Sequence, residues 1–191
     1  MLELQKNLAT RLLYTNPVVL LSVDREAIMT LTWITAMNNH GGFVVSINNR
    51  RHTRGHVMEK RRFCLGIPTS DMRSTVLAVG GCSGRDGNKF DALGLETVQV
   101  GDGPDVTVKG TVARILADVN AVLADDGYHT ILQCTIRRAW VDETYWDGRN
   151  FLPKDAAASP YLTFLGSQTF AAVTALPPVA AETDENAPAV D

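Results

Sequence analysis

The segment 106–141 constrains the fold most strongly, because it contains two extended runs joined by a tight turn. Alternating apolar and polar residues predict a strand within 106–123, and a second long strand is predicted for 129–141. The sequence Asp125-Asp126-Gly127 between the two runs is typical of a turn. The segment therefore predicts a long antiparallel hairpin.

Most of the remaining chain also predicts hairpins, with short helices inserted between them. Further strands are predicted at 18–23, 27–37, 62–67 and 161–165, and another begins at Gly42. Short helices are predicted at 2–13, 53–60, 71–79 and 89–93. Strands and helices do not alternate regularly, as they would in a parallel sheet. The pattern favours a mainly β fold, namely a closed antiparallel barrel with inserted helices.

Length and composition indicate one globular domain followed by a tail. The chain has 191 residues, of which 45% are hydrophobic and 20% are charged. These values are ordinary for a single domain with one core, which we expect to span 1–170. Residues 171–191 are rich in Ala, Pro and acidic residues and contain almost no large apolar side chain. We therefore predict that they form a disordered tail.

The three cysteines indicate a reducing compartment. Cys64, Cys82 and Cys134 are an odd number at wide spacing, which argues against a disulfide framework. No apolar run approaches the length of a membrane span, and the N-terminus lacks the basic-then-apolar arrangement of a signal peptide. No Cys/His cluster has the spacing of zinc ligands. We expect a cytoplasmic protein without a membrane anchor or a metal site.

A basic stretch follows the apolar run that begins at Gly42. Residues 50–62 contain six Lys or Arg and one Glu. Thr53 is a suitable N-cap for the helix that follows. A strand, a basic loop and a helix start suit an anion, because the first amide groups of a helix attract negative charge and Arg51 can form two hydrogen bonds with a phosphate. The alternative is a solvated basic loop with an ordinary N-cap.

Familiar catalytic and nucleotide-binding motifs are missing. The glycine-rich segment 80–87 fits neither the dinucleotide-binding fingerprint nor the P-loop, and by itself it predicts a flexible surface loop. No Gly-x-Ser-x-Gly sequence is present. His52 and His56 are four residues apart, but Glu59 is the only nearby carboxylate for a metal site. If the chain is an enzyme, a cofactor is expected to supply its chemistry.

Four segments together resemble the flavin reductase-like family, over about residues 17–170. They are Ala-Ile-Met-Thr-Leu-Thr-Trp at 27–33, the strand and Arg-His-Thr loop at 46–53, Ser-Gly-Arg-Asp-Gly-Asn-Lys-Phe at 83–90, and Gly-Tyr-His-Thr at 127–130. The resemblance implies an antiparallel, Greek-key type split β-barrel that binds FMN. It also implies a homodimer that reacts with NAD(P)H and a small electron acceptor.

The resemblance further implies which residues contact FMN. They are Met29, Thr30, Leu31, Thr32, Trp33, Ser46, Asn48, Arg51, His52, Thr53, Lys89 and Phe90. It implies that His129 contacts the nicotinamide or the acceptor. Ordinary structural roles remain open as alternatives: the threonines as strand formers, Trp33 as a buried aromatic residue, Lys89 as a surface lysine and His129 as a hydrogen-bonded strand histidine.

The sequence is compatible with three functions. The first is a flavin reductase, in which a hydride passes from NAD(P)H to N5 of FMN. The second is a binding protein that carries FMN, or a haem-like ligand, without turnover. The third is a nucleic-acid-binding barrel that uses residues 50–62. The third is the weakest, because the net charge is −3 and Phe63 is the only aromatic residue beside that stretch.

Overall fold

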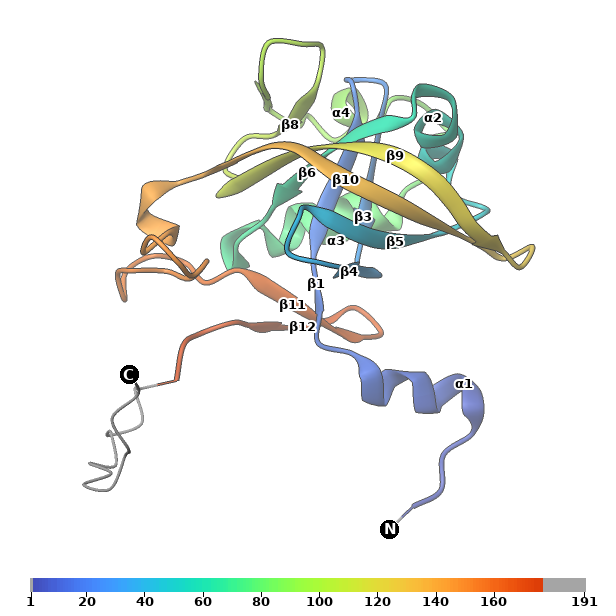
Figure 1. Cartoon of the computed structure of the whole chain (residues 1–191), viewed down its shortest axis with the longest axis horizontal. Coiled ribbons are helices and arrows are strands. Elements are labelled where there is room, and N and C mark those ends of the chain that lie inside the picture. The colour runs from blue at the N-terminus through green and yellow to red at the C-terminus, as the bar shows by residue number, and fades with distance from the viewer. Residues whose placement is uncertain (1, 177–191) are drawn as a thin grey trace, which may run out of the picture.

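The fold is built on a curled antiparallel sheet, as the computed structural model, which describes residues 2–176, shows (Figure 1). Seven strands follow the order β3-β2-β6-β9-β10-β5-β4, and every ladder is antiparallel. Their bounds are Val19–Val23 (β2), Ala27–Leu31 (β3), Ile34–Ala36 (β4), Gly42–Asn48 (β5), Arg62–Ile67 (β6), Ala113–Asp125 (β9) and His129–Val141 (β10). The predicted mainly β fold is confirmed.

The barrel is split along one seam. Strand β3 pairs with β2, and β4 pairs with β5 at the opposite edge of the sheet. In the part of the chain that the structure describes, no ladder joins β3 to β4. The predicted single strand at 27–37 is therefore wrong: Thr32 and Trp33 interrupt it, because the chain crosses there from one edge of the sheet to the other.

The predicted long hairpin exists, but it is shorter than expected on one side. Strand β10 has the predicted bounds, whereas β9 begins at Ala113. Residues 106–108 instead form β8 (Val106–Val108), which pairs with β7 (Thr97–Gln99). The β9–β10 ladder contains three register shifts. Such irregularities increase twist and bending, which helps the sheet to curl.

Strand β2 separates two hydrophobic clusters. Val19 and Leu21 belong to a cluster inside the curled sheet, together with residues of β5, β6, β9 and β10. Leu20 belongs to the second cluster, which includes residues of α3 and α4. Successive strand residues point to opposite faces, so a strand covered on both faces is buried along its whole length, and its one polar residue, Ser22, donates its hydroxyl to the carbonyl of Val106. This explains the uninterrupted burial of β2.

Three helices are grouped near β3 (Figure 1). They are α2 (His52–Lys60), α3 (Arg73–Gly81) and α4 (Lys89–Ala92), and each contacts β3. Helix α3 follows the 3₁₀ helix η2 (Ser70–Met72) and extends two residues into the segment predicted as a glycine loop. The predicted N-terminal helix is two short pieces, α1 (Lys6–Ala9) and η1 (Thr10–Leu13).

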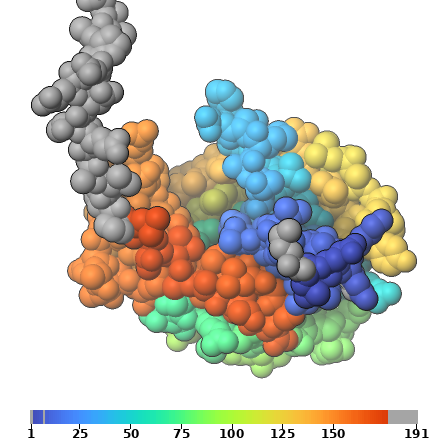
Figure 2. All heavy atoms as spheres, turned by 90° about the horizontal axis from the view of Figure 1, so that it is seen from below, coloured from blue at the N-terminus to red at the C-terminus, as the bar shows by residue number. Residues whose placement is uncertain are grey.

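The C-terminal part forms a second small sheet with the N-terminal segment. Strands β1 (Asn16–Pro17), β11 (Leu162–Gly166) and β12 (Thr169–Ala172) form this sheet, after the 3₁₀ helix η3 (Glu143–Tyr145). Figure 2 shows the N-terminal segment in dark blue against this hairpin in red-orange. Strand β12 includes residues 171 and 172, which were predicted to begin the tail. The rest of that prediction falls mostly on 177–191, which lie outside the described residues.

Among residues 2–176, no helix has both the length and the apolar character needed to cross a membrane.

Two glycines should respond oppositely to alanine substitution. A Cβ atom on Gly66, in β6, would overlap the Thr107 hydroxyl and lie 2.8 Å from Cγ2 of Thr111. Gly66→Ala should lower the free energy of unfolding by about 1–3 kcal/mol, because the packing there is already tight. Gly55, within α2, has no atom within 4 Å of such a Cβ. Gly55→Ala should raise the free energy of unfolding by about 0.5–1 kcal/mol, because alanine is a better helix former than glycine. Urea unfolding measures both, and a shift of the same sign in the two variants would contradict this account.

Candidate functional site

A cavity of about 190 Å³ lies where the start of α2 faces the end of α3. Three segments that are distant in the sequence form its wall. The lining residues are Met29, Arg50, Arg51, His52, Thr53, Gly80, Gly81, Cys82, Ser83, Gly84 and Lys89. This set contains Arg, Lys and His but no carboxylate. The predicted cofactor residues Met29, Arg51, His52, Thr53 and Lys89 are thus brought together in one place.

The start of α2 presents free amide groups to this cavity. Helix α2 begins at His52, its N-cap is Arg51, and no side chain caps it. The prediction that Thr53 is the N-cap is therefore wrong, because Thr53 is the second helical residue, with a buried side chain. The first amide groups of a helix have no intrahelical acceptor. Together with the guanidinium of Arg51, they form a suitable site for an anion.

His52 places an unpaired nitrogen at the cavity. In the described part of the chain, its buried Nδ1 atom has no hydrogen-bond partner. Burial lowers the pKa of His52, and the positive charges of His56, Arg85 and Lys89 lower it further. A Cβ atom on Gly84 would lie 2.7 Å from this Nδ1 atom, so only glycine fits there without a shift of the ring. The His52 ring is therefore packed closely against Gly84, in the wall of the cavity.

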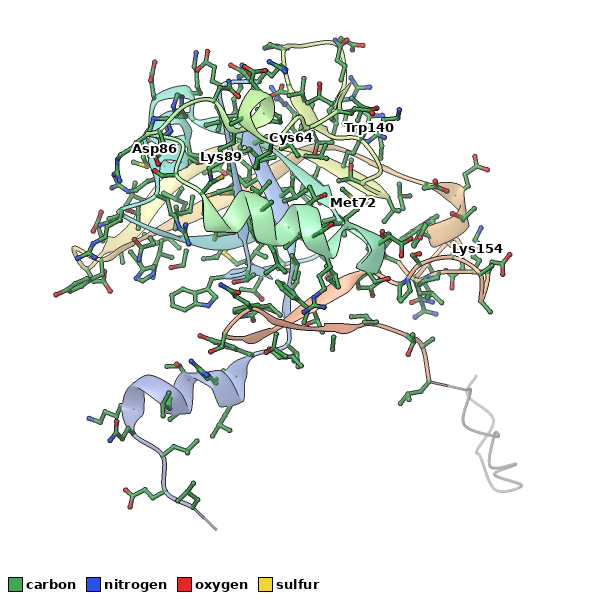
Figure 3. All side chains as sticks on the ribbon, turned by 180° about the vertical axis from the view of Figure 1, so that it is seen from behind. Cys64, Met72, Asp86, Lys89, Trp140 and Lys154 are labelled. Carbon is green, nitrogen blue, oxygen red and sulfur yellow. The ribbon has the colours of Figure 1, made fainter. Side chains whose placement is uncertain are left out.

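Lys89 is buried, not the surface lysine of the alternative interpretation. Its side chain comes from the start of α4 (Figure 3), is 7% exposed and donates a 2.7 Å hydrogen bond from Nζ to the carbonyl of Val79. Burial lowers the pKa of Lys89, and the positive charge of Arg51 lowers it further. A lysine held in this way provides positive charge at the cavity wall, because its ammonium group is only partly compensated by a carbonyl.

A second cavity, of about 290 Å³, adjoins the first. Its lining residues are Thr30, Thr32, Arg51, Val76, Leu77, Gly80, Gly81, Phe164, Ser167, Gln168 and Phe170. The two cavities share Arg51, Gly80 and Gly81, and Nη1 of Arg51 lies 3.4 Å from the carbonyl oxygen of Gly80 between them. The first cavity is lined mainly by polar and cationic residues, whereas the second combines the apolar side chains of Val76, Leu77, Phe164 and Phe170 with polar ones. Together they suit an elongated ligand with an anionic end and an apolar end.

The hairpin tip between β11 and β12 was not predicted as part of the site. Ser167 and Gln168 line the second cavity, and both have left-handed backbone conformations, with φ values of 48° and 63°. Such conformations are uncommon in residues other than glycine and often occur at functional positions. Only the Gly166-Ser167-Gln168 sequence between two short apolar runs could have indicated this turn.

The glycine-rich segment at the end of α3 and just after it contributes more to the cavity than its local sequence predicted. Its residues 80–84 line the first cavity, including Cys82 and Ser83, whereas the segment alone predicted a flexible surface loop. The small residues allow the backbone to approach the ligand space closely. Neither familiar glycine fingerprint could have revealed this, because the loop ends a helix here and does not follow a strand.

Four other predicted residues form a separate group beside the seam. The rings of Trp33 and His129 have centroids 4.8 Å apart, and Nδ2 of Asn48 lies 3.4 Å from Nε2 of His129. Trp33 is 39% exposed, so it is not the buried aromatic residue of the alternative interpretation. The backbone amide of Ser46 donates to the carbonyl of Trp33 at 2.9 Å. None of the four lines the two cavities described above.

Three predicted side chains have structural partners. Leu31 and Phe90 are 4% and 1% exposed and belong to the two hydrophobic clusters, so their side chains pack in the core. The hydroxyl of Thr30 lines the second cavity but donates a 2.7 Å hydrogen bond to the carbonyl of Val76 in α3. Thr30 therefore fixes α3 against β3, and Thr32 is the threonine on this wall without such a bond among the described residues.

Comparisons with known proteins identify the family and the fold. The sequence profile of the family described as Flavin reductase like domain matches residues 10–153. No match was found among curated protein sequences. Among solved structures, the chain is similar to flavoredoxin from Methanosarcina acetivorans, with 18% identity, 96% of each chain covered and a TM-score of 0.76.

Two further structures have the same fold. The FMN-binding domain of a flavin reductases-like enzyme from Shewanella baltica has 20% identity and a TM-score of 0.76, with 93% of this chain and 96% of that chain covered. The NADH:FAD oxidoreductase of Streptomyces globisporus has 12% identity and a TM-score of 0.69, with 92% of this chain and 98% of that chain covered. At these identities the likeness establishes the split-barrel fold.

The confined His52 predicts a pH dependence of stability. Its pKa in the folded chain lies below the unfolded value of 6.5, so the unfolded chain binds more protons as the pH falls below 6.5. This contribution to stability is present above pH 6.5 and is lost below it. Between pH 8 and about pH 5, the wild type should lose more unfolding free energy than His52→Asn. Urea titrations measure this, with His40→Asn, at an exposed loop position, as the control. Equal losses in the wild type and His52→Asn would contradict the assignment.

Proposed function

The chain belongs to the flavin reductase-like family, and we propose that it binds FMN and acts as an NAD(P)H-dependent oxidoreductase. The observation that best supports FMN is the pair of adjoining cavities. One is cationic and lies at a helix start, and the other includes the aromatic side chains of Phe164 and Phe170 in its wall. These two environments correspond to the two ends of a flavin mononucleotide, a phosphate and a planar ring system.

The residues present fit the cofactor. The phosphate would be held by the first amides of α2, by Arg51 and by the Thr53 hydroxyl. The buried Nδ1 atom of His52, which has no hydrogen-bond partner among the described residues, lies in the wall of the same cavity, because Gly84 lets the ring pack close to the loop. The ring system would lie toward Thr32 and the hairpin tip at 167–168. The predicted contacts of Ser46 and Asn48 are retained in the proposal as ribityl or ring contacts.

When bound, FMN supplies the acceptor for a hydride and passes electrons on to a second molecule. The chain's own contribution is positioning and charge. Lys89 places a buried ammonium group in the wall of the first cavity, where it would add positive charge beside the phosphate. Trp33 and His129 form a partly exposed aromatic surface that would contact the nicotinamide. The family and the similarity in fold to a protein named NADH:FAD oxidoreductase support this assignment.

We also propose a homodimer in the cytoplasm. Exposed leucines in the N-terminal segment, Leu12 at 75% and Leu13 at 81%, leave apolar surface that a second copy would cover. The three cysteines are free, which suits a reducing compartment. Light scattering after size-exclusion chromatography tests the dimer: a monomeric mass at micromolar concentration would refute it.

Reduction of the bound flavin separates an enzyme from a carrier. The purified protein should be yellow, and NADH or NADPH should bleach the flavin absorbance under anaerobic conditions. A yellow protein that neither coenzyme bleaches would refute the reductase and favour the second candidate, a protein that binds FMN without turnover. A colourless protein that does not bind added FMN would refute both.

Arg51 should matter more for FMN affinity than other exposed arginines. Arg51→Ala removes charge-assisted hydrogen bonds worth about 1.5–3 kcal/mol, so Kd for FMN should rise roughly 10- to 100-fold. Quenching of flavin fluorescence measures it. The matched control is Arg73→Ala, which removes the same charge at the opposite end of α3, away from the cavity. An unchanged Kd in Arg51→Ala would mean that the phosphate binds elsewhere.

A further inference from the structure

A polar cluster around one buried hydroxyl joins the loop after β5 to the β9–β10 hairpin. At its centre is the hydroxyl of Thr130, whose residue is fully buried. Nε of Arg54 donates to this hydroxyl at 2.7 Å. The hydroxyl lies 2.7 Å from Oδ1 of Asn49 and 2.9 Å from Oδ2 of Asp125, and its single proton can be donated to either. One hydroxyl thus connects three side chains from three places in the fold.

The partners of Thr130 also bind one another. Nη2 of Arg54 lies 3.1 Å from Oδ2 of Asp125, and Nδ2 of Asn49 donates to Oδ1 of Asp125 at 2.9 Å. The backbone amide of Asn49 donates to the carbonyl of Tyr128 at 2.7 Å. These contacts enclose the hydroxyl in a network whose members are mutually dependent.

The cluster lies between two parts of the proposed site. Asn49 and Arg54 flank the residues 51–53, which carry the anion-binding amides of α2. On the other side, Thr130 is next to His129, whose ring contacts Trp33 and Asn48. A substitution at Thr130 would therefore displace both the proposed phosphate-binding turn and His129.

Burial decides which member of the cluster matters most. Arg54 and Asp125 have side chains 27% and 36% exposed, and ion pairs of this kind contribute little by themselves. The Thr130 hydroxyl is buried, so its loss would leave the Nε–H group of Arg54 and the carbonyl oxygen of Asn49 without that partner. Leaving such groups unpaired is costly, and small displacements of positioning groups strongly affect binding and rate.

We propose that Thr130 is a positioning residue that holds the anion-binding turn of α2 and His129 in a fixed relation. The inference rests on the proposed function, in which FMN phosphate binds at that turn and the nicotinamide contacts His129. It goes further by assigning a role to a buried hydroxyl that lines neither cavity. Asn49, Arg54 and Asp125 act through this hydroxyl.

Two substitutions isolate the hydroxyl. Thr130→Val keeps the branched shape but removes the hydroxyl, and Thr130→Ser keeps the hydroxyl. Thr135→Val is the matched control, because Thr135 lies on the same strand and its hydroxyl donates to Asn120 at 2.8 Å on an exposed surface. Hydrogen exchange of the ligand-free proteins is followed by mass spectrometry. FMN affinity and the rate of anaerobic flavin reduction are then measured on the same proteins.

Thr130→Val should speed exchange in the peptides that cover 48–54 and 126–132, but not elsewhere in the sheet. It should raise Kd for FMN about tenfold and slow flavin reduction about tenfold at saturating coenzyme. Thr130→Ser and Thr135→Val should stay within about twofold of the wild type in all three measurements.

The positioning role is overturned if Thr130→Val leaves exchange in those two peptides unchanged, or speeds it uniformly over the sheet. It is also overturned if Thr130→Ser behaves like Thr130→Val. A wild type that binds no FMN, or is not reduced by NAD(P)H, refutes the proposed function instead. The exchange measurement needs no ligand, so it still decides the role of Thr130 in that case.

Discussion

The open seam of the barrel is the constraint on which the rest of the structure depends. Thr32 and Trp33 carry the chain from β3 to β4, at opposite edges of the same curled sheet. Because β3 has no strand partner on its outer side among the described residues, its outer edge is available to other elements. Helices α2, α3 and α4 contact β3, and the start of α2 and the end of α3 meet beside Met29. The cavities therefore follow from the way in which these helices cover β3.

In the free protein, several cationic side chains share one cavity without a carboxylate in its wall, and a bound anion would offset their mutual repulsion. The first cavity contains two arginines, a lysine and a histidine, and no carboxylate lines it. Burial shifts the pKa values of Lys89 and His52 toward their neutral forms, which shows that water alone does not solvate their charge well. The partly buried Arg62, in contrast, has carboxylate partners in Asp24 and Asp105. Among the described residues no carboxylate pairs with Lys89 in this way, which favours a ligand-facing role over a structural ion pair.

Local sequence predicted the elements well where periodicity and turn chemistry agreed. Strands β6 and β10 have the predicted bounds, and α2 differs only by its first residue. Predictions failed where the outcome depends on contacts between distant segments. The break in the 27–37 run is required by pairing with two different strands, and no residue within the run marks it clearly. Strand β12 extends past the predicted end of the domain because it pairs with β11, although its composition resembles that of the tail.

The sequence by itself determined the fold class and the position of the turn that leads from β5 into α2. Both depend on local order, namely hairpins with short turns and a strand that leads through a basic loop into a helix. Only the tertiary structure decided which side chains reach the site. It placed Leu31 and Phe90 in the core, engaged Thr30 with α3, and brought residues 80–84 and 167–168 to the cavity walls. The physical reason is that the packing of an element against other elements decides which of its side chains face the site. A short stretch of sequence carries no information about contacts with distant segments.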